Sequence, residues 1–306
     1  MNSDASNPAL IGVDWGTSSL RAYLIGKQGE VLDSQSTDDG IMQIPDRQFE
    51  AALHRVIDPW ITGQRLPLLA SGMITSRNGW LETPYIEAPT GIDKLSDSLL
   101  PLSLDNGLTL HCIAGVSIDH NDTPDVMRGE ETQVAGAVAG GMDNGILVMP
   151  GTHSKWVTVR NGGIADFETY MTGEIFAALR KHTILGTLMK NGNFCKQAFS
   201  DGLVTGSKSN SKLLHSLFSV RTLPLFQKMD SSKVADYLSG MLIGAEIAGA
   251  TCNRSNEDSV TILGRSDLSE RYAIAIQTLG LTCERLADNS IAKGYLGIAT
   301  AAGMLT

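Results

Sequence analysis

A short loop near the amino terminus combines an acid with glycine and hydroxyl side chains. The segment LIGVDWGTSSLRAYLI reads as two short apolar strands, and the loop between them carries Asp14, Gly16, Thr17 and Ser18. Glycine lets the backbone approach a ligand closely, and successive N–H groups with hydroxyls form a concave anion site. A carboxylate at the strand end can hold Mg²⁺ against phosphates that the loop binds. The alternative is a polar turn that satisfies its own backbone.

The same pattern recurs in the segment ILVMPGTHSKWVTV, at a constant offset of 135 residues that aligns Ile11 with Ile146. The second loop contains a glycine and hydroxyl residues but no acid, because Met149 occupies the place of Asp14; its members are Gly151, Thr152, His153 and Ser154. Chance similarity of two glycine–threonine hairpins is the alternative to a repeat. Two phosphate loops with one metal-holding carboxylate indicate a single nucleotide bound from both sides.

A third glycine follows an apolar run in the segment VTILGRSDLSERY. A strand, then Gly264, then a helix is an arrangement in which adenine or ribose can lie at the edge of a sheet. A plain strand–helix turn is equally compatible with this short pattern.

Phosphoryl transfer also needs a group that accepts the proton of the attacking hydroxyl. The segment DVMRGEETQVAGAV offers Asp125 and Glu131 for this role, beside Arg128 and Glu130. An acidic helix start, stabilised by the helix dipole, is the alternative reading. Arg77 follows the end of a predicted strand, where the ligands of such sheets gather, although a surface charge is the simpler interpretation.

The elements that must position these residues alternate between strands and helices. Helical spacing is found in RQFEAALHRVIDPWI and GEETQVAGAVAGGM, and short apolar runs typical of strands are found in RLPLLASGMI and LTLHCIAGVSI. After residue 145 the order is strand, loop, strand, turn, strand, and then helices. The alternation predicts an α/β fold with a largely parallel sheet, built as two similar halves.

Composition narrows the classes of function. The chain has 306 residues, 42% hydrophobic and 19% charged, with a formal net charge of −9. This charge argues against binding to nucleic acid or to an anionic membrane surface, so an anionic substrate needs a local basic pocket. No signal peptide and no membrane-spanning run are apparent, and we expect a cytoplasmic protein.

Six segments together resemble one family of sugar-acid kinases. In chain order they are VDWGTSSLRAYL, SGMITSRNGWLETPY, DVMRGEETQVAGAV, MPGTHSKWV, TYMTGEIFAALRKHTIL and YLSGMLIGAEI. They resemble the 2-dehydro-3-deoxygalactonokinases of the actin/hexokinase/Hsp70 superfamily, from about residue 10 to the carboxyl terminus. The resemblance implies transfer of phosphate from ATP, with Mg²⁺, to the 6-hydroxyl of 2-dehydro-3-deoxy-D-galactonate in galactonate breakdown.

The resemblance also implies two actin-like (ribonuclease H-like) domains with a nucleotide cleft between them. The first would comprise residues 1–140, with the helix at 290–306 packing back on it, and the second residues 141–289. The expected partners are the sugar acid and ATP, and a homodimer is left open.

Site residues follow from the same resemblance. The first phosphate loop of the family falls on Asp14 to Ser18, the second on Gly151 to Ser154, and the adenosine segment lies near Gly264, where Gly-Arg-Ser replaces the glycine pair of many superfamily members. Related phosphatases carry their catalytic glutamate in a Gly-x-Glu-Glu setting, which favours Glu131 over Asp125 as the base. The residues expected to contact the sugar acid are Arg77, Arg128, Lys155 and Glu174.

Two other functions fit the same fold. An exopolyphosphatase-like hydrolase would use water in place of the sugar. A nucleotide-switched binding protein, like actin or Hsp70, would use ATP without a sugar substrate. The chain has no appended peptide-binding domain and no filament-length insertion, which argues against the second.

Overall fold

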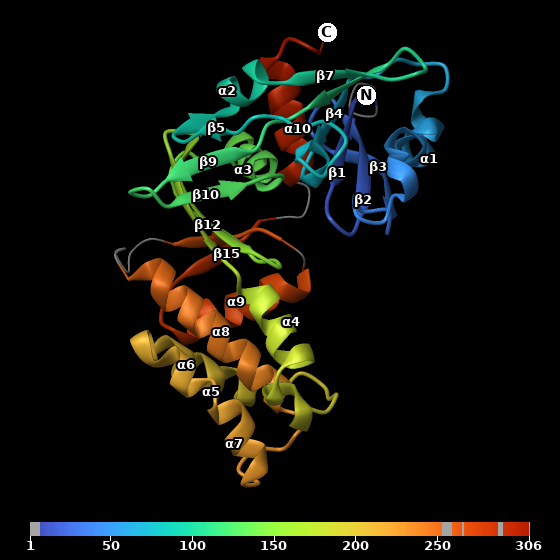
Figure 1. Ribbon diagram of the computed structural model, residues 1–306. Coiled ribbons are helices and arrows are strands. Elements are labelled where there is room, and N and C mark those ends of the chain that lie inside the picture. Colours follow the sequence, from blue (N-terminus) through green and yellow to red (C-terminus); the bar gives the residue numbers. More distant parts are fainter. Residues whose placement is uncertain (1–6, 253–258, 265, 287–289, 306) are drawn as a thin grey trace, which may run out of the picture. The chain divides into compact units, whose positions relative to one another are not determined.

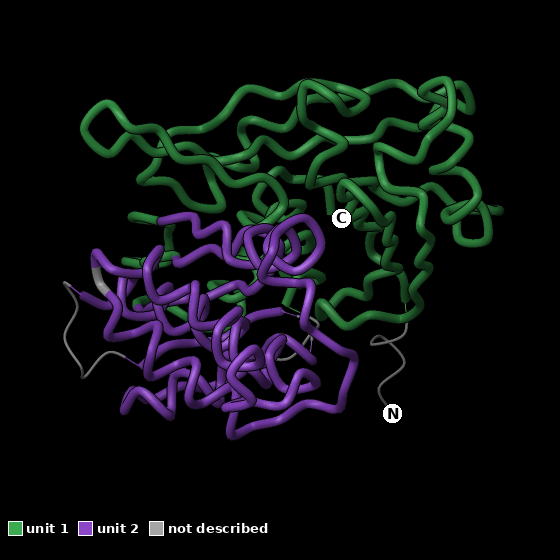
Figure 2. The backbone as a smooth tube through the Cα atoms, turned by 60° about the horizontal axis from the view of Figure 1, so that its bottom comes forward, with its two compact units in different colours: residues 1–144, 157–167, 287–306 green, residues 145–156, 168–286 purple. Residues whose placement is uncertain are grey.

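The computed structural model describes residues 7–252, 259–264, 266–286 and 290–305. The chain divides into two compact units, of residues 1–144, 157–167 and 287–306 and of residues 145–156 and 168–286 (Figure 2). Residues 157–167 therefore group with the first unit, whereas the sequence analysis placed them in the second domain. None of the described helices combines the length and apolar character needed to cross a membrane.

The main sheet of the first unit has the strand order β3-β2-β1-β4-β8-β7 (Figure 1). Its strands are β1 (Pro8–Trp15), β2 (Leu20–Gly26), β3 (Val31–Thr37), β4 (Leu68–Ser71), β7 (Leu100–Ser103) and β8 (Thr109–Cys112). The strands β1, β4 and β8 are parallel, while β2, β3 and β7 pair antiparallel with their neighbours. The α/β prediction is confirmed, but this sheet is mixed because hairpins add strands at both sides of its parallel centre.

The two faces of this sheet have different roles. Alternate residues of β1, β4 and β8 point to opposite faces, and one face packs with α1 (Phe49–Ile61) into a core that includes Ile11, Leu68 and Leu110. The other face carries α10 (Ser290–Ala301), which also packs against α3 (Glu130–Ala139). Asp14 and Ser71 lie side by side on this second face.

The predicted strand in LTLHCIAGVSI is in fact two strands in two sheets. After β8, the N–H of Ile113 still bonds to Ala70, but the carbonyl of Gly115 accepts from Ile86 of a different strand. The chain thus leaves the main sheet and enters a three-stranded sheet of order β10-β9-β5. Its strands are β5 (Ile86–Glu87), β9 (Val116–Asp119) and β10 (Pro124–Met127); β6 (Thr90–Gly91) and α2 (Ile92–Asp97) complete the unit.

A six-stranded sheet has the strand order β15-β14-β11-β12-β13-β6, and its strand residues outside β6 and residues 157–167 belong to the second unit. These are β11 (Gly145–Met149), β12 (Ser154–Arg160), β13 (Gly163–Tyr170), β14 (Val260–Ile262) and β15 (Cys283–Arg285), and β13 pairs with β6 through Gly163 and Ile164. The helices are α4 (Thr172–His182), α5 (Lys196–Ser207), α6 (Leu213–Ser216), α7 (Ser219–Leu225), α8 (Val234–Thr251) and α9 (Ser266–Thr278). The strand–loop–strand repeat and the strand–glycine–helix segment are confirmed here.

One close approach joins α10 to the centre of the main sheet. A Cβ atom added to Gly12 would lie 2.3 Å from the ring of Tyr295, so only glycine fits under that ring. We predict that Gly12→Ala lowers the free energy of unfolding by about 1–3 kcal/mol through overpacking, measured by thermal or denaturant unfolding. Gly91→Ala is the control, because its added Cβ meets nothing closer than 3.7 Å. Equal stability of the two variants would contradict the packing of Tyr295 on β1.

Candidate functional site

The first glycine–hydroxyl loop turns sharply between β1 and β2. The N–H of Gly16 donates to the carbonyl of Ser19 at 2.9 Å, and the carbonyl of Gly16 accepts from Ile41 at 3.0 Å. The side chains of Thr17 and Ser18 are exposed, and among the described residues no acceptor receives their N–H groups. Consecutive N–H groups without a protein acceptor, together with two hydroxyls, are donors of the kind that bind phosphate oxygens.

Asp14 lies at the carboxyl end of β1, directly before this loop. Its side chain is 23% exposed, and burial raises the pKa of its carboxyl to about 6. The guanidinium of Arg21, 3.9 Å away, opposes this shift, whereas the charge of Glu130 adds to it. Asp14 is therefore an incompletely compensated carboxylate, and a cation would stabilise its ionised form.

The residues present fit a magnesium ion better than a protein-only metal cage. Within the described parts of the chain, no three His, Cys, Asp or Glu side chains gather as a metal cluster. Magnesium is usually held by one or two carboxylates together with substrate phosphates and water. A desolvated Asp14 beside a loop with free N–H donors matches the carboxylate part of that requirement.

Three main-chain segments converge beside Asp14. Gly72 follows β4 with a φ of +92°, and a Cβ added there would lie 2.8 Å from the carbonyl oxygen of Trp15 and 3.4 Å from Oδ1 of Asp14. A Cβ added to Gly129, just before α3, would lie 3.1 Å from the Cα of Gly72. The end of β1, the turn after β4 and the start of α3 therefore meet backbone to backbone.

The predicted base Glu131 lies in the first turn of α3, with no exposed surface. Its Oε2 accepts from the N–H of Gly129 at 2.6 Å, and its Oε1 accepts from the hydroxyl of Thr132 at 3.2 Å. Burial, with a smaller contribution from the charge of Glu130, raises the pKa of Glu131 to about 7. Glu130 itself is half-buried, and its charge reaches both Glu131 and Asp14.

Arg128 is occupied by protein groups rather than free for a ligand. Its Nη1 donates to the carbonyl and hydroxyl of Thr75 at 2.6 and 2.8 Å and to the hydroxyl of Thr83 at 2.5 Å. Its guanidinium also stacks on Tyr85 at 4.3 Å, and only its buried Nε lacks a partner among the described residues. Arg128 therefore fastens the loop after β4 to the start of α3.

The other candidates of the first unit differ in accessibility. Arg77 is exposed near the tip of the loop that Arg128 fastens, and it has no hydrogen bond or ion pair within the described part of the chain. Asp125 lies within β10, in the three-stranded sheet, where its Oδ1 accepts from the N–H of Val126 at 2.7 Å. Asp125 is not among the charges that shift Asp14 or Glu131.

A tyrosine of α10, which the sequence analysis did not identify, contacts the sheet next to Asp14. The hydroxyl of Tyr295 lies 2.6 Å from Oγ of Ser71, beside Asp14 in the sheet. Burial raises the pKa of Tyr295 well above its usual value, and the charges of Asp14 and Glu131 act in the same direction. Nothing in the alanine- and glycine-rich segment around this tyrosine signals such a position.

The second glycine–hydroxyl loop, between β11 and β12, resembles the first in its free donors. Thr152 and His153 are exposed, and among the described residues no acceptor receives their N–H groups. Nε2 of His153 lies 2.5 Å from Oε2 of Glu174, whose N–H donates to the carbonyl of Thr152 at 2.9 Å. The structure thus joins two predicted site residues, because α4 begins against the loop.

Two further predicted residues of this loop face inward. Ser154 is fully buried, and its hydroxyl lies 2.8 Å from the hydroxyl of Tyr272. Lys155 is 5% exposed and donates to Thr169 at 2.7 Å. Their side chains therefore support the loop from behind, whereas the sequence analysis expected them to contact nucleotide and substrate.

The support behind Ser154 is a buried polar network that the sequence did not signal. Glu246 accepts from Tyr272 at 2.7 Å and from the indole of Trp156 at 2.8 Å. Burial raises the pKa of Glu246, and hydrogen bonds from Thr172, Tyr272 and Trp156 oppose the shift. A fully bonded buried network of this kind holds its members in one arrangement.

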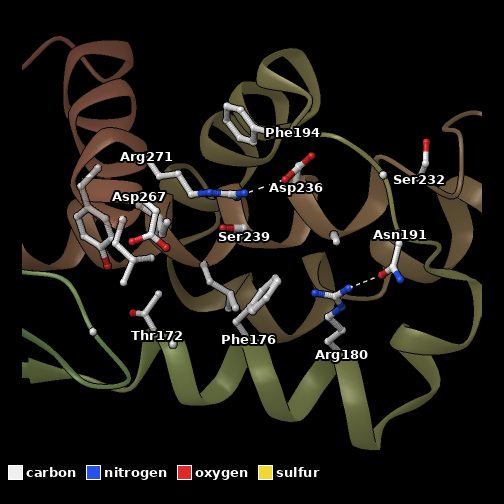
Figure 3. A pocket seen from close by; sticks show the side chains of 18 of the residues that line it. Thr172, Phe176, Arg180, Asn191, Phe194, Ser232, Asp236, Ser239, Asp267 and Arg271 are labelled. Carbon is white, nitrogen blue, oxygen red and sulfur yellow. Dashed lines mark hydrogen bonds and ion pairs between the residues drawn. The ribbon is translucent and has the colours of Figure 1, made fainter. Parts of the chain in front are cut away.

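A cavity of about 340 Å³ adjoins the second loop at Gly151 (Figure 3). It lies between α4, α8 and the start of α9, and Thr172, Phe176 and Arg180 border it from one face of α4. Arg271 crosses it, paired with Asp236 at 3.2 Å and stacked on Phe194 at 4.5 Å. Other lining residues include Asp267 and Leu268 in the first turn of α9.

Gly264 stands next to the second loop rather than in the cavity wall. It has a φ of +152°, and a Cβ added there would lie 3.6 Å from Pro150. Its carbonyl accepts from the hydroxyl of Ser269 at 2.9 Å. The predicted adenosine segment is therefore adjacent to the loop, with the cavity opening beside the helix that follows it.

Comparison with known proteins assigns the chain to a family. A family model described as 2-keto-3-deoxy-galactonokinase matches residues 14–298. The chain belongs to this family. It is 33% identical to the 2-dehydro-3-deoxygalactonokinase of Escherichia coli K12 over 293 residues, which are 95% of this chain and 97% of the relative. A Rhizobium meliloti protein with the same description is also 33% identical, over 94% of this chain and 96% of its own.

A solved structure agrees with this assignment. The crystal structure of a Sinorhizobium meliloti protein described as a 2-dehydro-3-deoxygalactonokinase superposes with a TM-score of 0.87 at 32% identity, over 96% of this chain and 98% of that one. The chain is thus a sugar kinase, a phosphotransferase, and its α/β fold is of the actin-like type, as the sequence predicted. The site residues of this kinase stay predictions.

The buried carboxyl of Glu131 gives a prediction about stability. Its pKa is about 7 when folded, against an ordinary 4.5, so the folded state retains a proton that the unfolded chain releases between these values. Ionisation therefore destabilises the folded state as pH rises through that window. We expect Glu131→Gln to gain stability relative to the parent protein at pH 8 but not at pH 5, by about 2 kcal/mol.

Thermal unfolding at the two pH values measures this effect, with the exposed Glu82→Gln as the control. The control should differ equally from the parent at both pH values. If the stability difference between Glu131→Gln and the parent protein does not change with pH, the carboxyl of Glu131 has the same pKa in the folded and unfolded states.

Proposed function

We propose that this kinase transfers the γ-phosphoryl group of ATP to the 6-hydroxyl of 2-dehydro-3-deoxy-D-galactonate in galactonate breakdown. The observation that carries the proposal is the pair of strand-end loops with free N–H groups, at Thr17 and Ser18 and at Thr152 and His153. Each offers donors to phosphate oxygens, and only the first follows a strand with an aspartate, Asp14, near its carboxyl end. The sugar acid is inferred from the descriptions of the relatives.

The cavity beside the second loop supports ATP as the phosphoryl donor. Its volume of about 340 Å³ lies in the range of small-molecule sites. The guanidinium of Arg271, whose central carbon lies 4.5 Å from the centre of the Phe194 ring, is a planar group on which adenine can stack. Because Gly151 belongs both to the loop and to the cavity wall, a nucleoside bound here directs its phosphates toward the loop donors.

Asp14 is the residue that would hold magnesium. Bound there with the phosphates, the ion neutralises charge on the transferred group and on the leaving ADP. The raised pKa of Asp14 supports this role, since the cation supplies the compensation that the protein leaves incomplete.

The base is proposed to come from the acidic first turn of α3. The substrate oxygen bonds to the γ-phosphorus, the bond to the ADP oxygen breaks, and the hydroxyl proton passes to a carboxylate. Glu131 has a pKa near 7, which suits a general base at neutral pH. Because Glu131 is enclosed, it reaches a substrate only if the first turn of α3 opens, and half-buried Glu130 is the accessible alternative.

Arg77 is proposed to bind the carboxylate of the sugar acid. The protein carries a net charge of −9, so an anionic substrate requires a local cation. Arg77 is exposed on the loop after β4, the strand whose end adjoins Asp14, and its planar guanidinium matches a carboxylate. Arg128 is already bonded to two threonines, which favours Arg77.

Turnover should require the sugar acid. We expect ADP release from ATP and Mg²⁺ only when 2-dehydro-3-deoxy-D-galactonate is present, followed by a coupled assay. Glu131→Gln should lower kcat by roughly 10²–10⁴, the usual contribution of a general base, while Asp125→Asn retains activity. The variant Glu130→Gln tests whether the general base is Glu130 or Glu131.

Each outcome has a distinct meaning. Phosphate release without the sugar acid would indicate a hydrolase and contradict the proposal. Loss of kcat in Glu130→Gln alone would move the base to Glu130, and loss in Asp125→Asn alone would move it to β10.

Arg77→Met should raise the KM for the sugar acid and leave the KM for ATP unchanged. Loss of a charge-assisted pair costs on the order of 2–3 kcal/mol, roughly 30- to 150-fold in KM. Steady-state kinetics with each substrate varied in turn measures this, with Arg160→Met as the control because that arginine is exposed at the end of β12. A KM for the acid within about twofold of the parent value would exclude Arg77 from this role.

A further inference from the structure

A second large cavity lies at the amino ends of the central strands of the main sheet, whereas Asp14 lies near the carboxyl end of β1. It has a volume of about 820 Å³ and is bordered by Pro8, Pro67 and Thr109, where β1, β4 and β8 begin. Asp14 stands near the other end of β1, six residues further, or about 20 Å at the usual rise per strand residue. This cavity is therefore separate from the proposed catalytic region.

The charge of this cavity differs from that of the protein. Lys27, Arg65 and His111 line it, and none of its described lining residues is acidic, although the chain as a whole carries −9. Lys27 and Arg65 are exposed, and within the described part of the chain neither has a hydrogen bond or an ion pair. A cationic cavity on an acidic protein concentrates anions locally.

The sheet register allows the two flexible cations to converge. Lys27 follows Gly26, which pairs with Pro8, and Arg65 shortly precedes β4, on the other side of β1. Two strand spacings are about 10 Å, a span that a lysine and an arginine side chain can bridge to reach one anionic group.

His111 also borders this cavity. In the sheet, His111 pairs with Leu69 of β4, and Leu69 pairs with Gly12 of β1. Gly12 lies against Tyr295, so His111 is on the face of the sheet that α10 covers. Its Nδ1 is buried and has no hydrogen-bond partner among the described residues. Because Nδ1 is closed to solvent, a ligand in the cavity meets the ring at its other atoms.

The remaining wall is apolar. Leu66, Leu108, Leu296 and Met304 border the cavity, the last two from α10 and the segment after it. The carbonyl end of α10 adjoins the cavity at Thr300 and carries partial negative charge, which disfavours an anionic group on that side. An anionic ligand would therefore turn its charged end toward the cations and its carbon skeleton toward α10.

We propose that the cavity at the amino ends of β1, β4 and β8 binds a small organic anion. Its phosphate or carboxylate group contacts Lys27, Arg65 and His111, and its carbon chain packs against Leu296 and Met304. The site is distinct from the one that binds ATP and the sugar acid, and it does not depend on the proposed function.

Histidine NMR tests the site directly, because His111 lies in this cavity and reports on it alone. Protein labelled at histidine is titrated with n-butyl phosphate, with pentanoate and with inorganic phosphate, and the His111 signal is identified by its absence in His111→Gln. We expect a saturable shift with at least one of the two organic anions, which distinguishes a phosphate from a carboxylate ligand. Inorganic phosphate tests the charged group without a carbon chain.

The double variant Lys27→Gln/Arg65→Gln should bind the effective probe at least about tenfold more weakly, since two charge-assisted contacts are lost. Arg160→Gln, which removes an exposed cation elsewhere in the same unit, should bind like the parent protein. Unchanged thermal unfolding confirms that each variant is folded. No shift of His111, a linear shift equal to that with sodium chloride, or equal binding by the double variant would overturn the proposal.

Discussion

The backbone contact of Gly72 with the end of β1 and with the start of α3 is the constraint on which the first unit depends. Because no side chain fits between these segments, the end of β1 and the first turn of α3 are brought close together. Desolvation then raises the pKa values of both Asp14 and Glu131. The same burial costs stability when these carboxyls ionise.

Both units support an exposed loop on a buried tyrosine–serine contact. Tyr295 of α10 meets Ser71 at the end of β4, and Tyr272 of α9 meets Ser154 at the start of β12. In each case a residue of a helix bonds to a strand end next to the loop. Buried side-chain hydrogen bonds of this kind fix the orientation of the residues that carry them.

The basic side chains near the two cavities and the loops differ in whether they are paired with other protein groups. Arg128 and Arg271 are engaged by threonines, a carboxylate and aromatic rings, so they act chiefly as structural clamps. Arg77, Lys27 and Arg65 are exposed and have no protein partner within the described residues. Unpaired cations are where an anion gains most, since no internal pair has to be broken.

The sequence by itself determined the local features: the strand–loop–strand repeats at Gly16 and Gly151, the helix after Gly129 and the α/β class. Loop chemistry and hydrophobic periodicity depend on neighbouring residues, so they can be read along the chain. Only the tertiary structure decided that Arg128 and Ser154 point inward, that LTLHCIAGVSI splits between two sheets, and that Tyr295 and Glu246 lie behind the loops. These roles depend on which residues distant in sequence become neighbours, and burial and hydrogen bonding exist only after folding.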